Sequence, residues 1–356
     1  MDGTHLNNKI GIVGGGITGL ISAYFLSLEG YKVDLYEKKT LLSETSSKTT
    51  KLIHGGIRYL ENLQFHEVKN GINDRKWWLE NFPDETKLQE IIILSKKKLS
   101  PEIFKFFFGI KVYETFAGRS NIKTGRLYKQ DNLLSLGIKN NISAGISFYD
   151  GLMQESVGRE IIKRCKRNGV NFYENNEIKS IRSEGRIEEK QYKKIIIATG
   201  PWVSSSLKQN KIDTNKTIDY IKGSHLIINR KIKKGLMFRD QKKHRYIFAL
   251  PYQGNLLLGT TEQRVRSPED NHVLDSEVNY LLESINIYID RPINKDEIIK
   301  SYSGVRPLIK SKAQDFHSSS RDFYIQKDHN LLSLFGGKWT TAPSIARNIV
   351  RIVNNE

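Results

Sequence analysis

The chain has 356 residues, of which 38% are hydrophobic and 27% charged, and its formal net charge is +18 at pH 7. This length supports two structural units around a substantial core, and the composition excludes a disordered chain. The sequence has no apolar run of the about 20 residues that cross a bilayer, and residues 1–8 lack the pattern of a signal peptide. We therefore expect a cytoplasmic protein, with at most peripheral contact to the inner face of a membrane.

The single cysteine, Cys165, excludes an internal disulfide and a cysteine-based metal cage. We predict that it is a small buried apolar residue in a helix, and we expect no metal site. The positive charge is spread along the whole chain, whereas nucleic-acid binders more often concentrate theirs in a patch. We therefore expect no nucleic-acid partner, although RNA binding through the basic surface stays an alternative.

The N-terminal part predicts a βαβ unit made of a strand at 9–13, a glycine-rich turn, a helix over about 20–26 and a strand at 32–37. Gly14, Gly16 and Gly19 are spaced to make a tight turn that places a pyrophosphate on the positive end of the helix. Glu37 follows Gly14 by 23 positions, close to the spacing of the acid that binds an adenosine ribose. Together these features predict a dinucleotide site.

Further along the chain, helices are expected over about 62–82, at 149–168 after the end of a strand, at 276–290 and at the C-terminus. Strands are expected at 170–174, in a hairpin or meander at 178–197, and at 225–228, 246–250, 255–259 and 331–335. The aromatic and basic segment 101–113 fits either a helix on a membrane surface or a helix that packs its aromatic face on the body. Its apolar residues are only modestly segregated, which favours the packed helix.

Two late segments indicate an extended cofactor. Thr199 and Gly200 follow a strand, and Gly337 and Lys338 precede the last helix. A nicotinamide enzyme keeps its dinucleotide contacts largely within the first half of the domain, whereas a cofactor that spans the domain needs contacts from both chain ends. The pattern favours FAD over NAD.

The run SSKTTKLIHGGIRYLE at 46–61 has no clean period of 2 or 3.6, so packing alone does not explain it. This run and six further motifs resemble, in order and spacing, those of the FAD-dependent glycerol-3-phosphate dehydrogenases. The further motifs are IIIATGPWV at 195–203, IKGSH at 221–225, LPY with LGTTE between 250 and 262, YSGVRPL at 302–308, SRD at 320–322 and FGGKWTT at 335–341. The wider family is the glycine oxidase and D-amino-acid oxidase type of flavoprotein.

The resemblance implies an α/β fold with a Rossmann-like FAD-binding domain of the glutathione reductase type and a second, mainly antiparallel β substrate domain. We expect the FAD-binding domain to comprise 1–90, 145–220 and 300–356. The substrate-binding domain is expected to comprise 91–144 and 221–299.

The resemblance also implies roles for individual residues. The substrate phosphate would be held by Arg58, Tyr59, Arg321 and Lys338. His225 and Arg306 would face the carbinol that is oxidised. Contacts to FAD are expected from Gly14, Gly16, Ile17, Thr18, Gly19, Glu37, Ser46, Ser47, Leu52, Ile178, Thr199, Gly200, Gly337, Lys338 and Thr340. His54 fits either close approach to the flavin or simple packing.

These residue types suit the oxidation of sn-glycerol 3-phosphate to dihydroxyacetone phosphate by hydride transfer to flavin. A neutral imidazole suits His225 to the base role, and Arg306 can stabilise the developing alkoxide. Lys338, where the last helix begins, would also favour negative charge on reduced flavin. The electron acceptor stays open between a quinone, oxygen and a carrier protein, and so does the oligomeric state.

The chain departs from the family pattern in four places. It stops at Glu356, where the family usually continues into a helical C-terminal domain, so we expect that domain to be absent. Glu262 replaces the aspartate that ends the family motif Gly-Thr-Thr-Asp, and Trp339 replaces a leucine of the family. The segment 150–156 replaces an acidic helix start. These differences keep open a trimmed oxidoreductase that acts on another phosphorylated polyol or a phosphoglycerol-bearing compound in biosynthesis.

Overall fold

The computed structural model describes residues 8–57, 65–96, 101–117, 124–240, 245–310 and 323–355. Its helices are α1 Ile17–Leu28, α2 Phe65–Asn81, α3 Pro101–Ala117, α4 Gln130–Leu134, α5 Ser156–Arg167, α6 Val203–Gln209, α7 Asp275–Asn286 and α8 Ala342–Asn355, with short 3-10 helices η2 Thr45–Ser47, η4 Gly200–Trp202 and η5 Lys295–Glu297. Its strands are β1 Lys9–Val13, β2 Lys32–Tyr36, β3 Leu52–Ile53, β4 Thr86–Ser95, β5 Leu127–Lys129, β6 Ala144–Met153, β7 Asn171–Tyr173, β8 Ile181–Arg182, β9 Arg186–Ile187, β10 Lys190–Gln191, β11 Lys194–Ile197, β12 Ile218–Ile228, β13 Gly235–Arg239, β14 Tyr246–Tyr252, β15 Asn255–Gly259, β16 Gln263–Val265, β17 Ile298–Ile309, β18 Phe323–Asp328 and β19 Leu331–Gly336.

A six-stranded sheet in the order β18-β19-β11-β1-β2-β7 forms one half of the molecule. All its neighbours pair in parallel except the edge pair β18 and β19. Side chains alternate between its faces, because successive residues of a strand point to opposite sides. Ile196 of β11 packs under α1, α5 and α8, whereas Ile195 and Ile197 face α6 and the small sheet β10-β9-β8. The predicted βαβ unit is confirmed, and the sheet is covered on both faces.

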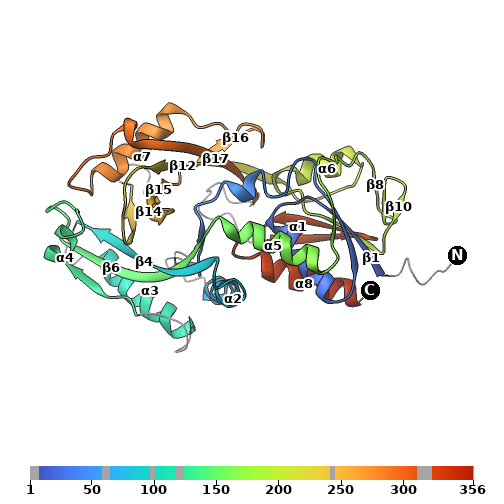
Figure 1. Cartoon of the computed structure of the whole chain (residues 1–356), viewed down its shortest axis with the longest axis horizontal. Helices are drawn as coiled ribbons and strands as arrows, with labels where there is room; N and C mark the ends of the chain where they lie inside the picture. The colour runs from blue at the N-terminus through green and yellow to red at the C-terminus, as the bar shows by residue number, and fades with distance from the viewer. Residues whose placement is uncertain are drawn as a thin grey trace.

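A larger curled sheet forms the other half, with the path β16-β12-β15-β14-β13-β4-β6-β3 and with β17 and β5 paired to β12 and β6. One face packs on α7 and α4, and the other packs on α2 and α3. Figure 1 shows the two halves side by side along the long axis, with both termini at the end that holds α1 and α8. The fold is therefore a mixed α/β fold with a Rossmann-like half, as predicted.

The large sheet takes strands from both predicted domains, since β3 and most of β6 fall in ranges assigned to the FAD-binding domain. The division of the chain into the two sets of ranges stays a prediction. Two element bounds differ from expectation. The strand expected to end near Tyr149 continues to Met153, because β6 pairs with β4 over its whole length, and the helix begins at Ser156. Helix α7 ends at Asn286 rather than at 290.

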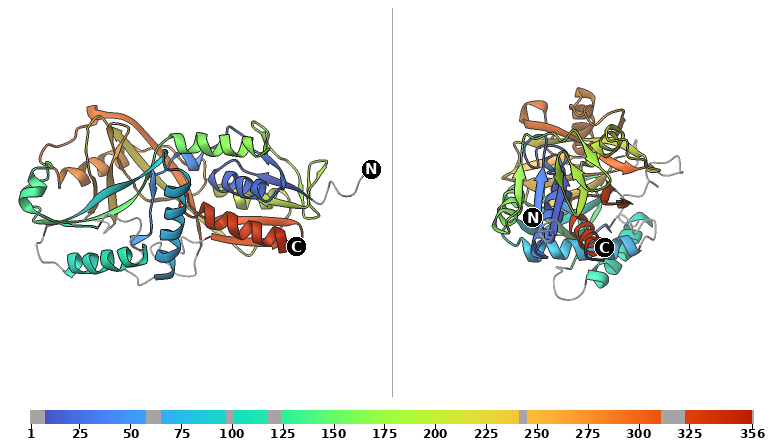
Figure 2. Two further views of the ribbon diagram at one scale, coloured as in Figure 1. Left: turned by 60° about the horizontal axis from the view of Figure 1, so that its bottom comes forward. Right: turned by 90° about the vertical axis from the view of Figure 1, so that its right-hand side faces the viewer.

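Cys165 is fully buried in α5, and burial raises the pKa of its thiol to about 12, so the prediction for this residue is confirmed. Helix α3, in the lower part of the second view in Figure 2, packs on the body through Phe106 and Ile110. Its neighbours Phe107 and Phe108 are 47% and 69% exposed. No helix in the described part of the chain is both long and apolar enough to cross a membrane.

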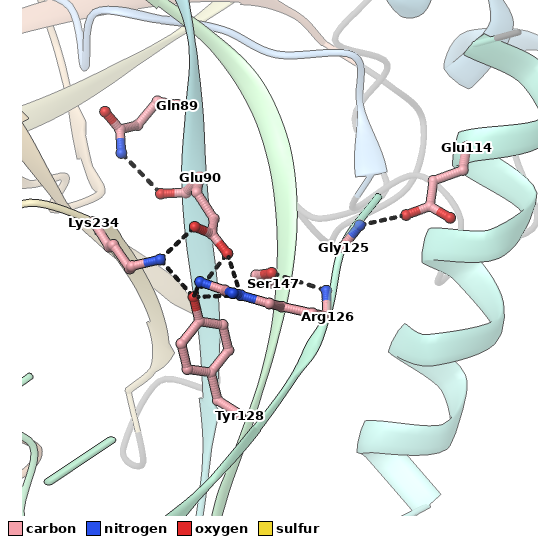
Figure 3. Close-up of polar contacts among 8 residues, drawn as sticks. All are labelled: Gln89, Glu90, Glu114, Gly125, Arg126, Tyr128, Ser147 and Lys234. Carbon is pink, nitrogen blue, oxygen red and sulfur yellow. Dashed lines mark hydrogen bonds and ion pairs between the residues drawn. The ribbon is translucent and has the colours of Figure 1, made fainter. Parts of the chain in front are cut away.

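A polar cluster on the large sheet joins β4, β5 and the loop before β13 (Figure 3). The carboxylate of Glu90 accepts a hydrogen bond from Tyr128 at 2.8 Å and pairs with Lys234 at 2.5 Å. Arg126 donates to the same tyrosine oxygen at 2.8 Å. Burial alone would raise the pKa of Glu90, but Lys234 and Tyr128 bring it below its ordinary value. The cluster therefore stays ionised and fastens three segments of the sheet.

Candidate active site

A cavity of about 1020 Å³ runs between the two halves. It starts where the parallel strands β1, β2, β11 and β19 end at their carboxyl edge, which is where open α/β sheets bind ligands. It reaches the strands β12, β14 and β17 of the large sheet. Its volume is at the upper end of ligand pockets, which measure about 300–1,000 Å³.

Most of the residues predicted to contact FAD line this cavity. They are Gly14, Gly16, Ile17, Thr18, Glu37, Ser46, Leu52, Ile178, Thr199, Gly200, Gly337, Lys338 and Thr340. Two described residues of the prediction do not line it. Gly19 lies beneath the turn, where a Cβ would meet the Gly14 carbonyl oxygen at 2.0 Å. The Ser47 hydroxyl donates to the carbonyl groups of Ser43 and Glu44 inside its own turn. The contacts themselves stay predictions.

The glycine-rich turn is shaped as the sequence requires. Gly14 has a φ of +113°, and a Cβ there would lie 2.4 Å from the carbonyl oxygen of Ala198. The Gly15 amide donates to Glu37 at 2.7 Å, and the Ile17 amide donates to Ser46 at 3.0 Å. These bonds bring the acid and the Ser46 segment to the N-terminus of α1.

The described residues of the cavity are suited to bind a dinucleotide cofactor. The side-chain oxygen of Thr199 is buried on the cavity wall and has no hydrogen-bond partner within the described ranges. Helix α1 begins at Ile17 after its N-cap Gly16, and both residues line the cavity, so the positive end of the helix faces the cavity. The turns at Gly14 and Gly337, both with positive φ, let backbone approach a bound group from opposite ends of the chain.

The last cofactor segment is fastened to the first. Trp339 donates from its indole nitrogen to the carbonyl of Ser46 at 2.8 Å, and its ring lies 5.6 Å from that of Trp78. The indole of Trp78 donates to the carbonyl of Thr340 at 3.2 Å. Trp339 therefore packs against α2 and joins the two segments across the cavity wall.

His225 lies in the second half of β12 and is only 2% exposed. Its ring stacks on Tyr302 with 5.0 Å between centroids, and its Nε2 is 2.9 Å from the Thr50 hydroxyl. The ring lies against Gly259, where a Cβ would come within 2.3 Å of it. Burial holds the pKa of His225 well below its usual value, and the positive charge of Arg306 adds to the effect. The imidazole is therefore neutral at physiological pH.

Arg306 lies in β17, next to β12, and also lines the cavity. Its Nη2 donates to the Thr260 hydroxyl at 2.8 Å. A Cβ at Gly223 would be 2.4 Å from that nitrogen, so only glycine leaves room for the guanidinium. His225 and Arg306 thus meet the cavity from neighbouring strands.

Lys338 lines the cavity between β19 and α8, and its backbone amide donates to the Thr341 hydroxyl at 3.1 Å. The other three residues predicted to bind the phosphate, Arg58, Tyr59 and Arg321, lie outside the described residues. His54 lines the cavity as well. The structure therefore brings His225, Arg306 and Lys338 to one cavity.

Several cavity residues were not selected from the sequence. Thr50 and Thr260 contact His225 and Arg306, and Asp74 of α2 is buried on the wall with its Oδ1 accepting from Ser344 at 2.6 Å. Both threonines are part of motifs recognised in the sequence. Their partners come from strands far away in the chain, so no local spacing reveals the contact.

Asp150, in the segment that departs from the family pattern, shapes the wall beside His54. Its carboxylate accepts from the Gly55 amide at 2.9 Å and from Arg75 at 3.1 Å. Both side chains of this pair are buried. The departure therefore supports a turn of the long run at 46–61.

The chain is similar to known proteins over most of its length. A family model described as FAD dependent oxidoreductase matches residues 9–352. An aerobic glycerol-3-phosphate dehydrogenase of Staphylococcus saprophyticus is 30% identical over 96% of this chain and 66% of its own length. The corresponding protein of Bacillus subtilis is 28% identical over 97% of this chain and 66% of its own length. The chain thus spans slightly less than two thirds of these relatives.

Solved structures show the same fold. A glycerol-3-phosphate dehydrogenase from Bacillus halodurans, complexed with FAD, superposes with a TM-score of 0.74 at 21% identity over 98% of this chain and 64% of that one. L-alpha-glycerophosphate oxidase from Mycoplasma pneumoniae, with FAD bound, has a TM-score of 0.78 at 20% identity over 97% and 94%. Glycine oxidase from Geobacillus kaustophilus has a TM-score of 0.74 at 16% identity over 98% and 95%. Because the family model covers nearly the whole chain, the protein belongs to the FAD dependent oxidoreductase family, and its cofactor is FAD.

Proposed function

We propose that the protein oxidises sn-glycerol 3-phosphate to dihydroxyacetone phosphate. The observation that carries the proposal is the pair formed by a buried neutral His225 and Arg306 on one wall of the cavity. The names of the two relatives from Staphylococcus saprophyticus and Bacillus subtilis support the substrate. Lys338 and Arg306 on the wall suit an anionic substrate.

The chemistry follows from the two side chains. Bound FAD supplies the acceptor for the hydride that leaves the carbinol carbon. His225 takes the hydroxyl proton on an imidazole nitrogen, which its lowered pKa keeps free of a proton beforehand. Arg306 stabilises the negative charge that develops on the substrate oxygen and then faces the ketone. Thr50 and Tyr302 hold the imidazole in one orientation while this happens.

The phosphate end of the proposal rests on Lys338 in the structure and on Arg58, Tyr59 and Arg321 from the sequence. Each charge-assisted contact to a phosphate contributes about 1.5 to 3 kcal/mol. The electron acceptor is proposed to be a quinone, oxygen or a carrier protein. A cytoplasmic location, with at most peripheral contact to a membrane, stays a prediction.

Anaerobic mixing of the yellow protein with a panel of phosphorylated alcohols tests the proposal. We expect sn-glycerol 3-phosphate to bleach the flavin absorbance faster than other phosphorylated polyols do. Bleaching by a different phosphorylated polyol alone would favour the trimmed-relative alternative. If no member of the panel bleaches the flavin, the proposed substrate class is wrong.

The variant His225→Asn tests the proposed base role of His225. It should retain FAD and slow flavin reduction by about 100- to 10,000-fold, the usual contribution of a general base. FAD content is read from the absorbance of the purified variant. Unchanged reduction kinetics would remove His225 from the base role without touching the substrate assignment.

A further inference from the structure

A carboxylate that does not line the cavity lies between two arginines behind the reacting site. Oε2 of Glu262 is 3.3 Å from Nη2 of Arg245, and its Oε1 is 3.9 Å from Nη1 of Arg306. We propose that Glu262 is a positioning residue, which holds the guanidinium of Arg306 against the substrate oxygen by sharing its charge with Arg245. This inference rests on the proposed function and assigns Glu262 a part in it.

Contacts on more than one side restrict the guanidinium of Arg306. Thr260 accepts from its Nη2 on one side, and Gly223 lies so close beneath it that even a Cβ would collide. Oε1 of Glu262 lies 3.9 Å from the other terminal nitrogen, which is an ion-pair distance and too long for a hydrogen bond. Arg306 also lines the cavity, so these contacts hold it at the cavity wall.

The partial burial of this cluster makes the negative charge of Glu262 important for the two arginines. The side chains of Arg245 and Glu262 are 7% and 17% exposed, and that of Arg306 is 33% exposed. Two guanidinium groups near one another repel, and the burial of Arg245 weakens the screening of this repulsion by water. One carboxylate between them offsets part of this repulsion, so Arg306 stays at the wall instead of turning toward solvent.

The same arrangement bears on the base. Arg306 and Arg245 both act to lower the pKa of His225. The two arginines that pair with Glu262 therefore also act on the protonation of the imidazole.

The test uses the flavin-loaded protein with three variants. Glu262→Gln keeps the shape and removes the charge, and Glu262→Asp keeps the charge on a shorter side chain. The control is Glu160→Gln, which removes a carboxylate that pairs with Arg164 at 3.0 Å on the surface of α5. FAD content and thermal midpoint are measured for all three.

The first readout is stopped-flow reduction of the flavin by sn-glycerol 3-phosphate. A displacement of about 1 Å in a reacting group can cost about 100-fold, so we expect the limiting rate in Glu262→Gln to fall by about 10- to 100-fold. Substrate affinity should change much less, since Arg306 acts on charge that develops during the reaction. Glu262→Asp should lie between wild type and Gln, and Glu160→Gln should equal wild type.

A double-mutant cycle identifies the residue through which Glu262 acts. In an Arg306→Lys background, Glu262→Gln should lower the limiting rate by much less than it does in wild type. A merely structural role for Glu262 would instead give equal losses in both backgrounds. Additive losses would therefore overturn the proposal.

A second readout does not depend on the substrate. Phenylglyoxal modifies arginine, and peptide mass spectrometry should show Arg306 reacting several-fold faster in Glu262→Gln than in wild type. Arg230, which pairs with Glu297 at 2.7 Å, is the internal control and should not change. If wild-type flavin is not reduced but Arg306 becomes more reactive, the proposed function fails while the positioning role stands. Unchanged reactivity of Arg306 in both Glu262 variants would overturn the positioning role.

Discussion

Glycines determine where the side chains of His225 and Arg306 can lie. The space for the Arg306 guanidinium exists because residue 223 has no Cβ, and the His225 ring occupies the corresponding space over Gly259. On the neighbouring strand β17, Gly304 pairs with Gly223 in register and leaves room for the Cβ of Lys48. Three glycines from three strands thus allow charged and aromatic groups to lie flat on the sheet.

Gly223→Ala should separate activity from stability. Its Cβ would come within 2.4 Å of Nη2 of Arg306 and of the Thr260 hydroxyl, and the guanidinium is the flexible partner that moves. We expect flavin reduction to slow by about 10- to 100-fold, with a loss of unfolding free energy below about 1 kcal/mol. Stopped-flow and urea unfolding measure the two effects. Retention of full activity would show that Arg306 tolerates displacement.

His225 also makes a prediction about acid stability. Its pKa is lowered by burial and by nearby positive charges, so the folded protein keeps it neutral where the unfolded chain binds a proton. The free energy of unfolding is therefore unaffected by this difference in pKa above about pH 6.5. It decreases as the pH falls from there toward the lowered pKa of His225 in the folded state.

His225→Asn should therefore reduce the acid sensitivity of the protein. Between pH 7 and pH 5 the free energy of unfolding should fall less in the variant than in wild type, by up to about 2 kcal/mol. Urea unfolding at the two pH values measures the difference. Equal falls in both proteins would mean that the imidazole already gains a proton in the folded state.

At the residue scale, the sequence predicted His225, Arg306 and Lys338 because each lies in a motif with a recognisable order. It did not predict Thr50, Thr260 or Glu262 as their partners. A hydrogen bond such as that between Thr50 and His225 joins positions 175 apart, and only the pairing of strands brings them together.

Among the elements, β12 and α7 are joined by a buried ion pair. Lys222 and Glu277 are 2.8 Å apart, with side chains 2% and 8% exposed. Thr261 donates to the same carboxylate at 2.6 Å and accepts from the Ser224 amide at 2.8 Å. Burial would raise the pKa of Glu277, but Lys222 and Thr261 outweigh it and lower the pKa. The pair therefore supports the turn that carries Thr260.

Removing one partner of this pair should be costly. Glu277→Gln leaves Lys222 buried without its counter-charge, and we expect a loss of about 3 to 5 kcal/mol in the free energy of unfolding. The double variant Lys222→Met with Glu277→Met should recover most of that loss, because a buried pair gains little over apolar packing. Urea unfolding compares both with wild type. A double variant less stable than Glu277→Gln would contradict the argument.

The elements that the sequence predicted well are those with a local signal. The strand at 9–13, the helix after it and the strand at 32–36 follow from periodicity and glycine spacing. The continuation of β6 to Met153 does not, because its ten-residue pairing with β4 overrides the local pattern. The antiparallel pairing of β12 with β17 places His225 and Arg306 on neighbouring strands. For the same reason, this pairing could not be predicted from the sequence of either strand alone.

At the scale of the molecule, both ends of the chain meet the same cavity. The first glycine turn and the turn at Gly337 lie on one sheet edge, and Trp339 bonds to Ser46 across it. The sequence indicated this convergence through its preference for FAD over NAD. The sequence did not indicate which residues form contacts between the two halves, because those residues do not belong to a recognisable sequence motif.

One such contact involves Trp202 on the cavity wall. The indole of Trp202, which lines the cavity from η4, donates to Oε1 of Glu269 at 2.6 Å. Glu269 belongs to the loop between β16 and α7, on the other half of the molecule. Hydrogen bonds from Ser267 and then from Trp202 lower the pKa of Glu269, so the carboxylate is ionised at neutral pH. The contact therefore joins this loop to the cavity wall at η4.

Loss of this contact should loosen FAD without affecting chemistry. Trp202→Phe keeps the ring but removes the donor, and Glu269→Ala removes the acceptor. A partly exposed hydrogen bond contributes about 0.5 to 1.5 kcal/mol, so each variant should release FAD about two- to tenfold faster. The recovery of flavin fluorescence after dilution measures this rate. Glu189→Ala, in the exposed turn between β9 and β10, is the control and should match wild type. Because the two changes remove one bond, the double variant should release FAD no faster than either single variant, and additive effects would show that the residues act separately.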